Sequence, residues 1–150
     1  MKSLDHHSII KVKEMYIEND KCFLVMEKST GCTLGELISK TRLDDKEVKH
    51  LFSKILEAIA YLHEKKICHR DIKPDNIMVS RDLQEIKIID FNVSANFSAG
   101  QLSGRVGNKV WSAPETKQKL FYDDLCDSWS LGLILFYLIT GEEPGLTQDF

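Results

Sequence analysis

The sequence has no long run of apolar residues. Its most apolar stretch, LGLILFYLIT at positions 131–140, covers ten residues, whereas a membrane-spanning helix needs about 20. Because nearly every position in this stretch is apolar, we expect a helix that is buried on all sides. The first ten residues, MKSLDHHSII, also lack the apolar core of a signal peptide. We therefore expect no membrane partner.

Paired cysteines and a strong net charge are missing too. The cysteines are scattered and form no Cys-x-x-Cys pair; they are Cys22, Cys32, Cys68 and Cys126. This spacing argues against a metal cluster or a disulfide framework, so we expect reduced thiols in a cytoplasmic protein. The formal net charge is −3, which gives no reason to expect a nucleic-acid partner. With 150 residues, 43% of them hydrophobic, the chain has the composition of one globular domain.

The predicted elements follow an order that is typical of an α+β fold. Asn19-Asp20 is a turn signal between two apolar segments, which predicts a hairpin. The expected elements are strands over 9–18 and 21–28, a short helix over 33–40, strands over 77–79 and 85–90, an exposed loop over 92–110 and an apolar helix from 127 to 141.

The clearest helix begins after Asp44. Glu47 follows three residues later, and this spacing is typical of a capping box with Asp as the cap. Apolar residues then recur at helical spacing from Val48 to Leu62 and define one buried face. The cations Lys65 and Lys66 suit a helix C-terminus, so we expect the helix to end there.

The segment HRDIKPDN places charged and polar groups unusually close together. Pro74 disfavours helix within the segment and biases Lys73 toward extended backbone. Asp71 and Lys73 are two positions apart, so an extended stretch places them on the same side. Asn76, and Asp90 at the end of the next strand pair, are oxygen ligands suited to a hard cation. An acid, a cation and two such ligands are the groups that phosphoryl transfer requires.

Four motifs, in this order, resemble those of the protein kinase catalytic domain. They are His69-Arg70-Asp71 with Asn76, similar to the catalytic loop; Asp90-Phe91-Asn92, similar to the magnesium motif; Ala113-Pro114-Glu115, similar to the end of the activation loop; and the segment from Asp127 to Gly132, similar to the start of the central helix. Lys73 corresponds to the serine/threonine form of the signature. The hinge and catalytic loop broadly resemble those of calcium/calmodulin-dependent or related kinases.

The resemblance implies a catalytic role for each polar residue of the loop. Asp71 would accept or orient the substrate hydroxyl, and Lys73 would steady the transferred phosphoryl group. Asn76 and Asp90 would hold magnesium. Arg70 would pair with a phosphorylated residue in the activation loop. ATP and Mg²⁺ are the implied cofactors, and a protein substrate with a serine or threonine acceptor is the implied partner.

The resemblance also implies an adenine site and a support for the loop. Met26 falls at the gatekeeper position, Glu27 begins the hinge, and Met78 corresponds to the apolar residue under the adenine ring. Lys73 would contact the phosphate end of the same nucleotide. Asp127 would hydrogen-bond the catalytic-loop backbone and also cap its own helix.

The chain resembles only the middle of that domain. We expect an incomplete protein kinase-like fold, in which residues 1–28 are the last strands of the N-lobe with the start of the hinge. Residues 29–150 would form the mainly helical core of the C-lobe, up to the central buried helix. No glycine-rich loop, strand lysine or partner glutamate lies within the chain. We expect these elements before Met1, and therefore a fragment that is inactive by itself.

Two departures from the family keep a second hypothesis open. Asn92 replaces glycine, although Asn tolerates positive φ better than most residues. Asn108 replaces a threonine that would contact the catalytic acid and lysine. The chain is thus either part of an ATP-dependent serine/threonine kinase or a non-catalytic, kinase-like binding module. Ser103, in the long loop, is a candidate phosphorylation site because of Arg70.

Overall fold

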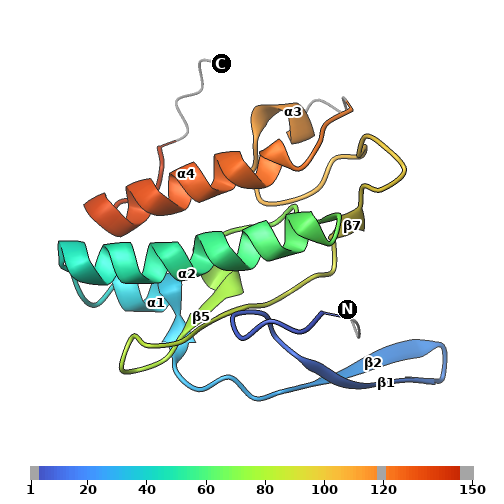
Figure 1. The fold of residues 1–150 in the computed structure, drawn as a ribbon, viewed down its shortest axis with the longest axis horizontal. Helices are drawn as coiled ribbons and strands as arrows, with labels where there is room; N and C mark the ends of the chain where they lie inside the picture. The colour runs from blue at the N-terminus through green and yellow to red at the C-terminus, as the bar shows by residue number, and fades with distance from the viewer. Residues whose placement is uncertain (1–3, 118–120, 146–150) are drawn as a thin grey trace.

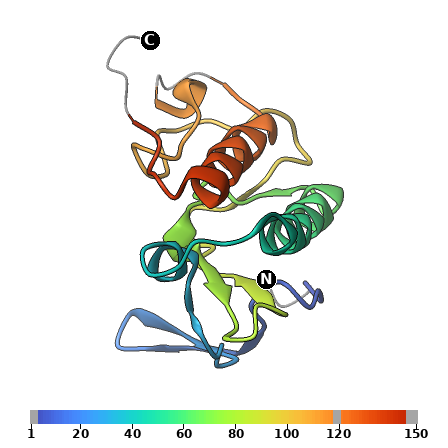
Figure 2. The same cartoon turned by 90° about the vertical axis from the view of Figure 1, so that its left-hand side faces the viewer.

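The computed structural model describes residues 4–117 and 121–145. It has the expected α+β composition, with small antiparallel sheets beside helices. Two long helices, α2 (Asp45–Glu64) and α4 (Leu125–Thr140), lie side by side, and the β1–β2 hairpin lies at the opposite end of the molecule (Figures 1 and 2). Within the described ranges, no helix combines the length and the apolar character that crossing a membrane would require.

Helix α2 begins with the capping box that the sequence predicts. The Asp44 carboxylate accepts hydrogen bonds from the backbone N–H groups of Lys46 and Glu47, both at 2.8 Å. The Glu47 carboxylate accepts the Asp44 N–H at 2.8 Å. The helix ends at Glu64, with Lys65 as its C-cap. Its buried face forms the centre of the main core and consists of Val48, Leu51, Ile55, Ala58, Ile59 and Leu62.

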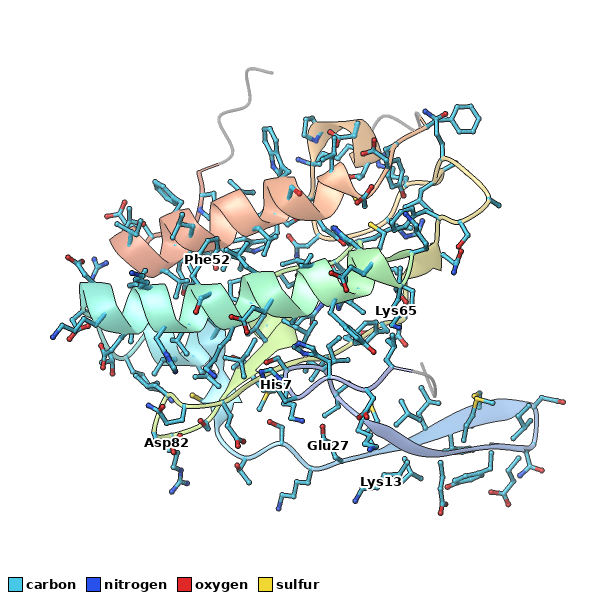
Figure 3. The ribbon with its side chains drawn as sticks, viewed as in Figure 1. His7, Lys13, Glu27, Phe52, Lys65 and Asp82 are labelled. Atoms are coloured by element: carbon cyan, nitrogen blue, oxygen red, sulfur yellow. The ribbon has the colours of Figure 1, made fainter. Side chains whose placement is uncertain are left out.

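Helix α4 is buried on one face rather than on all sides. It begins at Leu125, two residues before the expected start, and Gly141 ends it in the left-handed conformation with φ 68°. Ile134 is buried, and Phe52 of α2 packs between the two helices (Figure 3). By contrast, Trp129 and Ile139 are 50% and 64% exposed. The expectation of complete burial is wrong because, among the described residues, only one face of α4 packs against α2.

The predicted hairpin is present but shorter than expected. Strand β1 (Val12–Glu18) pairs with β2 (Lys21–Met26), and the two turn residues between them both have positive φ. This turn geometry matches the right-handed twist of the strands. Residues 9–11 lie outside β1 because Ile9 and Ile10 pair with Ile88 instead. Ile9 and Ile10 are therefore attached to the central sheet.

The central sheet has the order β3-β5-β6, and a second pair joins β4 to β7. Of the strands in these two sheets, only β5 and β6 are expected from the sequence. The part of the chain expected to be an irregular loop, 92–110, contains β7 and the buried Leu102, which bridges Tyr122. The remaining elements are β3 (Cys32–Thr33), α1 (Leu34–Ile38), β4 (Ile67–Cys68), the 3-10 helix η1 (Pro74–Asn76), β5 (Ile77–Val79), β6 (Ile86–Ile88), β7 (Ala95–Asn96) and α3 (Pro114–Lys117).

The hairpin generates a prediction about self-association. Both of its faces carry exposed apolar side chains: Ile17 is 73% exposed on one face, and Phe23 stacks on Tyr16 on the other. Exposed apolar strands promote association between chains. We expect the 150-residue chain to be poorly soluble and to self-associate, and Ile17→Lys combined with Phe23→Lys to raise the monomer fraction in sedimentation velocity experiments.

The control adds the same charge at exposed polar positions, as Thr30→Lys combined with Gln101→Lys. This variant should associate like the unaltered chain. A monodisperse monomer in solutions of the unaltered chain would contradict the prediction.

Candidate functional site

The carboxylate of Asp71 is held by three hydrogen-bond donors. Its Oδ2 lies 3.0 Å from Lys73 Nζ and accepts a hydrogen bond from Asn76 Nδ2 at 3.0 Å. Its Oδ1 accepts the backbone N–H of Asn108 at 3.0 Å. Asn76 Nδ2 also donates to the Asp71 carbonyl at 2.8 Å. The structure thus brings together three of the residues that the sequence selects, Asp71, Lys73 and Asn76.

The backbone around Pro74 explains this geometry. Lys73 is extended, with φ −156° and ψ 163°, as expected for a residue before proline. Pro74 then begins the short helix η1, which the sequence analysis did not expect. Proline fits the first helical position because its missing N–H would have no intrahelical partner there. This single turn carries Asn76 back toward Asp71.

Asp90 lies beside this group but is not bonded to it. The Ile89 N–H donates to the Asn76 carbonyl at 3.0 Å, so the backbone next to Asp90 is tied to the loop. Asp90 itself is exposed, and its carboxylate accepts the Asn92 N–H at 3.3 Å. Within the described residues, it makes no hydrogen bond or ion pair with Asp71 or Lys73. The carboxylate is therefore left accessible to solvent.

The turn after Asp90 does not need glycine at position 92. The left-handed residue is Asp90, with φ 61°, whereas Asn92 is not among the residues with positive φ. The turn closes through a hydrogen bond from the Ser94 N–H to the Phe91 carbonyl at 3.1 Å. Asn92 therefore fits this backbone without adopting positive φ, and the turn is formed with Asn in place of glycine.

Asn108 contacts Asp71 through its backbone. Its side-chain Oδ1 accepts the Val110 N–H at 2.8 Å, which fixes a local turn and leaves the main-chain N–H for Asp71. Gly107, with φ 88°, lets the chain approach, because a Cβ there would come within 2.6 Å of the Arg70 carbonyl oxygen. The contact expected of a threonine side chain is made here by the main chain.

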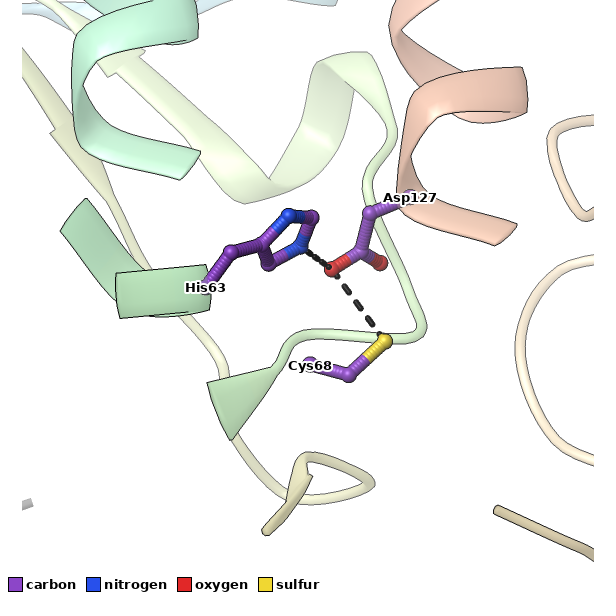
Figure 4. Close-up of side chains that lie close together, drawn as sticks. All are labelled: His63, Cys68 and Asp127. Carbon is purple, nitrogen blue, oxygen red and sulfur yellow. Dashed lines mark hydrogen bonds and ion pairs between the residues drawn. The ribbon is translucent and has the colours of Figure 1, made fainter. Parts of the chain in front are cut away.

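Asp127 lies beneath the loop and holds its backbone, as expected. Its Oδ2 and Oδ1 accept the N–H groups of His69 and Arg70, each at 2.8 Å. His63 Nε2 lies 2.9 Å from Oδ2, and Cys68 Sγ donates to the same oxygen (Figure 4). Burial alone would raise the pKa of Asp127. The hydrogen bonds from His63 and the two backbone N–H groups outweigh burial, so the pKa of this carboxyl group is lower than its usual value.

The expected capping role of Asp127 is wrong. Asp124 occupies the N-cap position of α4, and Asp127 lies inside the first turn. Its carboxylate is instead used entirely by the segment from Cys68 to Arg70 and by His63.

Arg70 joins the loop to two other segments. Its Nε donates to the Val93 carbonyl at 2.6 Å, and Nη1 donates to the Ser103 carbonyl at 3.3 Å and to the Tyr122 hydroxyl at 3.1 Å. Burial raises the pKa of Tyr122, and Arg70 opposes that shift in part. The guanidinium therefore lies within reach of the exposed Ser103.

Lys87 connects two of the three residues expected to contact adenine, Glu27 and Met78. Met26 ends β2, and Glu27 follows it with its carboxylate 2.6 Å from Lys87 Nζ. Lys87 lies directly opposite Met78 in the antiparallel β5–β6 pair, so both side chains are on the same face. The hydrogen bond from Lys87 lowers the pKa of Glu27.

Sequence reasoning missed the residues that support the site from a distance. His63 contacts Asp127 across 64 positions, Tyr122 contacts Arg70 across 52, and Lys87 contacts Glu27 across 60. No local pattern marks these residues, because their partners become neighbours only through the fold.

Comparison with known proteins identifies what this arrangement resembles. Residues 1–149 match the family model described as "Protein kinase domain". The chain is 36% identical over 149 residues to Calcium-dependent protein kinase 4 of Plasmodium falciparum (isolate 3D7), and 39% identical over 148 residues to Calcium-dependent protein kinase 5 of Plasmodium berghei (strain Anka). Each alignment covers 96% of this chain but only 28% and 26% of the relative, so the chain spans about a quarter of their length.

The buried carboxylate of Asp127 generates a stability prediction. Asp127→Asn turns one accepting oxygen into a donor that faces a backbone N–H, and we expect a loss of about 3 kcal/mol in the free energy of unfolding. For a chain of this size the melting temperature should fall by about 6–12 °C. Differential scanning calorimetry at pH 7 would measure the difference.

The control and the pH dependence distinguish this effect from a general loss of charge. Asp75→Asn removes the same charge from an exposed position of the same loop and should leave the melting temperature unchanged. Because folding lowers the pKa of Asp127, its stabilisation is present above the unfolded-state value of about 3.9 and is lost as the pH falls further. Equal melting temperatures for both variants at pH 7 would contradict the assignment.

Proposed function

This chain belongs to the protein kinase family, and we propose that the protein containing it transfers the terminal phosphoryl group of ATP to serine or threonine side chains of protein substrates. The observation that carries the proposal is the Asp71 carboxylate, fixed by Lys73, Asn76 and the backbone of Asn108. Phosphoryl transfer depends mainly on positioning and on charge stabilisation, and a small set of fixed polar groups supplies both.

Asp71 is the proposed acceptor for the substrate hydroxyl proton. Its three donors fix the carboxylate in one orientation, which reduces the reorganisation needed during the reaction. Lys73, 3.0 Å away, is the cation that would steady the phosphoryl group as negative charge develops on it. Lys73 is also the residue on which the preference for serine and threonine over tyrosine rests, through its match to that form of the family signature.

The metal and nucleotide assignments fit the donors that are present. Asn76 uses its Nδ2 to bind Asp71, so its Oδ1 is left as a neutral oxygen ligand, and Asp90 offers an exposed carboxylate. Both are hard ligands of the kind that Mg²⁺ prefers. Bound magnesium would neutralise charge on the phosphates of ATP. Met26, Glu27 and Met78 are the proposed adenine contacts.

The domain assignment follows from the same proposal. Residues 1–28 would form the end of the smaller lobe and the start of the hinge, and residues 29–150 the core of the larger lobe. The proposed partners are ATP and a protein substrate, without nucleic acid or membrane, and the proposed location is the cytoplasm, where the four free cysteines would stay reduced.

The alternative function is a kinase-like binding module without catalysis. One observation favours it: the Asn108 side chain is used in its own turn rather than on Asp71 or Lys73.

Replacing Asp71 tests the catalytic proposal. In the natural protein that contains these residues, Asp71→Asn should lower magnesium-dependent transfer from ATP to serine and threonine peptides by at least about 10²-fold, because it removes the proton acceptor. Asp75→Asn, in the same loop, should retain full activity. ATP binding without transfer in the unaltered protein would instead support the binding module, and transfer to tyrosine alone would contradict the assigned specificity.

The isolated 150-residue chain should show no measurable transfer. Removing one preorganised contact from an active site commonly costs about 10²–10³ in rate, and here several phosphate contacts of the family pattern are missing from the sequence. A radiolabelled ATP assay with a generic serine substrate is the measurement. Magnesium-dependent phosphorylation that Asp71→Ala abolishes would show this expectation to be wrong.

Ser103 is the proposed regulatory phosphorylation site. Its carbonyl already accepts a hydrogen bond from Arg70 Nη1, so a phosphate on its side chain would be close to that guanidinium. We expect Ser103→Ala to lower the activity of the natural protein and Ser98→Ala, in the same loop, to leave it unchanged. Mass spectrometry that repeatedly finds Ser103 unmodified in an active sample from cells would refute this assignment.

A further inference from the structure

A small pocket with three cations lies beside the Asp71 group. It has a volume of about 320 Å³ and is lined by residues of the segment 105–112 and by the last residue of α3. Ligand pockets have volumes of about 300–1,000 Å³, so this one is large enough for a side chain of a bound peptide. Its charged lining residues are Arg105, Lys109 and Lys117, and none of the described residues that line it is acidic. We call it the cationic pocket.

The positive charge of the cationic pocket is not neutralised by the described part of the chain. Acidic residues outnumber lysine and arginine by 23 to 20 in the sequence, so composition alone does not account for three cations without an acid. Within the described residues, Arg105, Lys109 and Lys117 form no ion pair. The first two are exposed, and Lys117 is half-buried. Like charges around one pocket repel one another, and a bound anion offsets that repulsion.

The cationic pocket adjoins the residue that holds the Asp71 carboxylate. Asn108 lines the pocket, and its backbone N–H donates to Asp71 Oδ1 at 3.0 Å. Gly107 allows this close approach, because a Cβ there would collide with the Arg70 carbonyl and the Ser112 hydroxyl. An extended peptide advances about 3.3 Å per residue. A peptide with its serine or threonine hydroxyl at Asp71 can therefore place a nearby side chain in the pocket.

The backbone that forms the cationic pocket is fixed by the rest of the fold. The Ser112 N–H donates to the Asn108 carbonyl at 3.0 Å and closes a turn. Trp111, which is buried, accepts a hydrogen bond from Ser130 Oγ of α4 at its carbonyl, 2.8 Å away, and its ring packs edge-on against Tyr137. A site whose backbone is already ordered loses less conformational entropy when it binds a ligand.

We propose that Arg105, Lys109 and Lys117 select peptide substrates with an anionic side chain, a carboxylate or a phosphate, within about three positions of the acceptor serine or threonine. The inference rests on the proposed kinase function and adds the class of substrate. The arginine offers a planar pair of donors to a carboxylate or phosphate, and the lysines add point charges. Because ion pairs at exposed positions are individually weak, we expect a combined preference of about 5–50-fold over a neutral side chain.

The peptide selectivity of the natural protein that contains these residues tests the proposal. A serine peptide with glutamine at the three positions on each side of the acceptor is compared with peptides that carry Asp, Glu or phosphoserine at one of these positions. We expect kcat/KM to rise by about 5–50-fold at one or two positions, mainly through a lower KM, because the pocket contacts the anion before and during transfer. A rise for all three residues would assign any anion to the pocket, and a rise for phosphoserine alone would assign phosphate; both support the proposal.

Charge-removing variants connect the preference to the cationic pocket. Arg105→Gln combined with Lys109→Gln should bring the ratio of kcat/KM between anionic and neutral peptides close to one. Arg105→Lys combined with Lys109→Arg keeps both charges and should retain the ratio. The matched control, Arg81→Gln combined with Lys40→Gln, removes the same charges from exposed positions outside the pocket, and it should also retain the ratio.

Peptide affinity separates this inference from the proposed catalysis. Fluorescence anisotropy should show that the natural protein binds the anionic peptides more tightly than the glutamine peptide, and Asp71→Asn should keep this difference while transfer is lost. The difference should shrink as the salt concentration rises from about 0.1 M to about 1 M, because the Debye length falls from about 10 Å to about 3 Å. Preferential binding of anionic peptides without any transfer would refute the kinase proposal and support the anion site.

Two results would overturn the substrate assignment. The first is equal affinity and equal kcat/KM for the anionic and glutamine peptides at every position, in a protein that transfers phosphate readily; the kinase proposal would then stand without this inference. The second is a preference for anionic peptides that persists in the Arg105 and Lys109 glutamine variant, which would place the selecting cations elsewhere in the protein.

Discussion

The geometry of the 69–76 loop depends on the carboxylate of Asp127. Arg70 has φ 67°, a conformation that costs a non-glycine residue about 1–2 kcal/mol. That conformation is retained because the N–H groups of His69 and Arg70 both donate to Asp127 at 2.8 Å. Strain of this kind persists only where surrounding contacts fix the backbone.

Asp71 follows directly after this strained residue. Asp127 therefore positions Asp71 without touching it, through two backbone hydrogen bonds and one left-handed residue. The carboxylates of Asp71 and Asp127 are therefore coupled through the backbone of residues 69–71, and a substitution of either residue alters this short segment.

Local sequence patterns predicted the parts of the fold that local interactions determine. The Asp44 and Glu47 capping box gave the start of α2 to the residue, because cap and helix lie within four positions. The group formed by Asp71, Lys73 and Asn76 could also be predicted from the sequence, because one proline and one turn bring the three residues together. The missed strands, β3, β4 and β7, are only two residues long, which is too short for any alternation to show.

The remaining parts of the site come from contacts between distant segments. Cys68 and Cys126 are 58 positions apart, so the absence of a Cys-x-x-Cys pair says nothing about whether they meet. The effect of the two departures from the family pattern, at Asn92 and Asn108, could be judged only from the folded structure. Asn92 occupies a position that does not require glycine, and Asn108 reaches Asp71 through a main-chain group that any residue except proline would supply.

The attachment of the hairpin has a mechanical consequence. The residues on either side of the β1–β2 hairpin are bonded to β6: Ser8 and Ile10 exchange backbone hydrogen bonds with Ile88, and the Glu27 carboxylate is bonded to Lys87. The residue after β6, Ile89, donates its own N–H to the Asn76 carbonyl. The residues that flank the hairpin are thus linked through β6 to the backbone of Asn76, so a displacement of the hairpin that moves β6 would also move the residue that holds the Asp71 carboxylate.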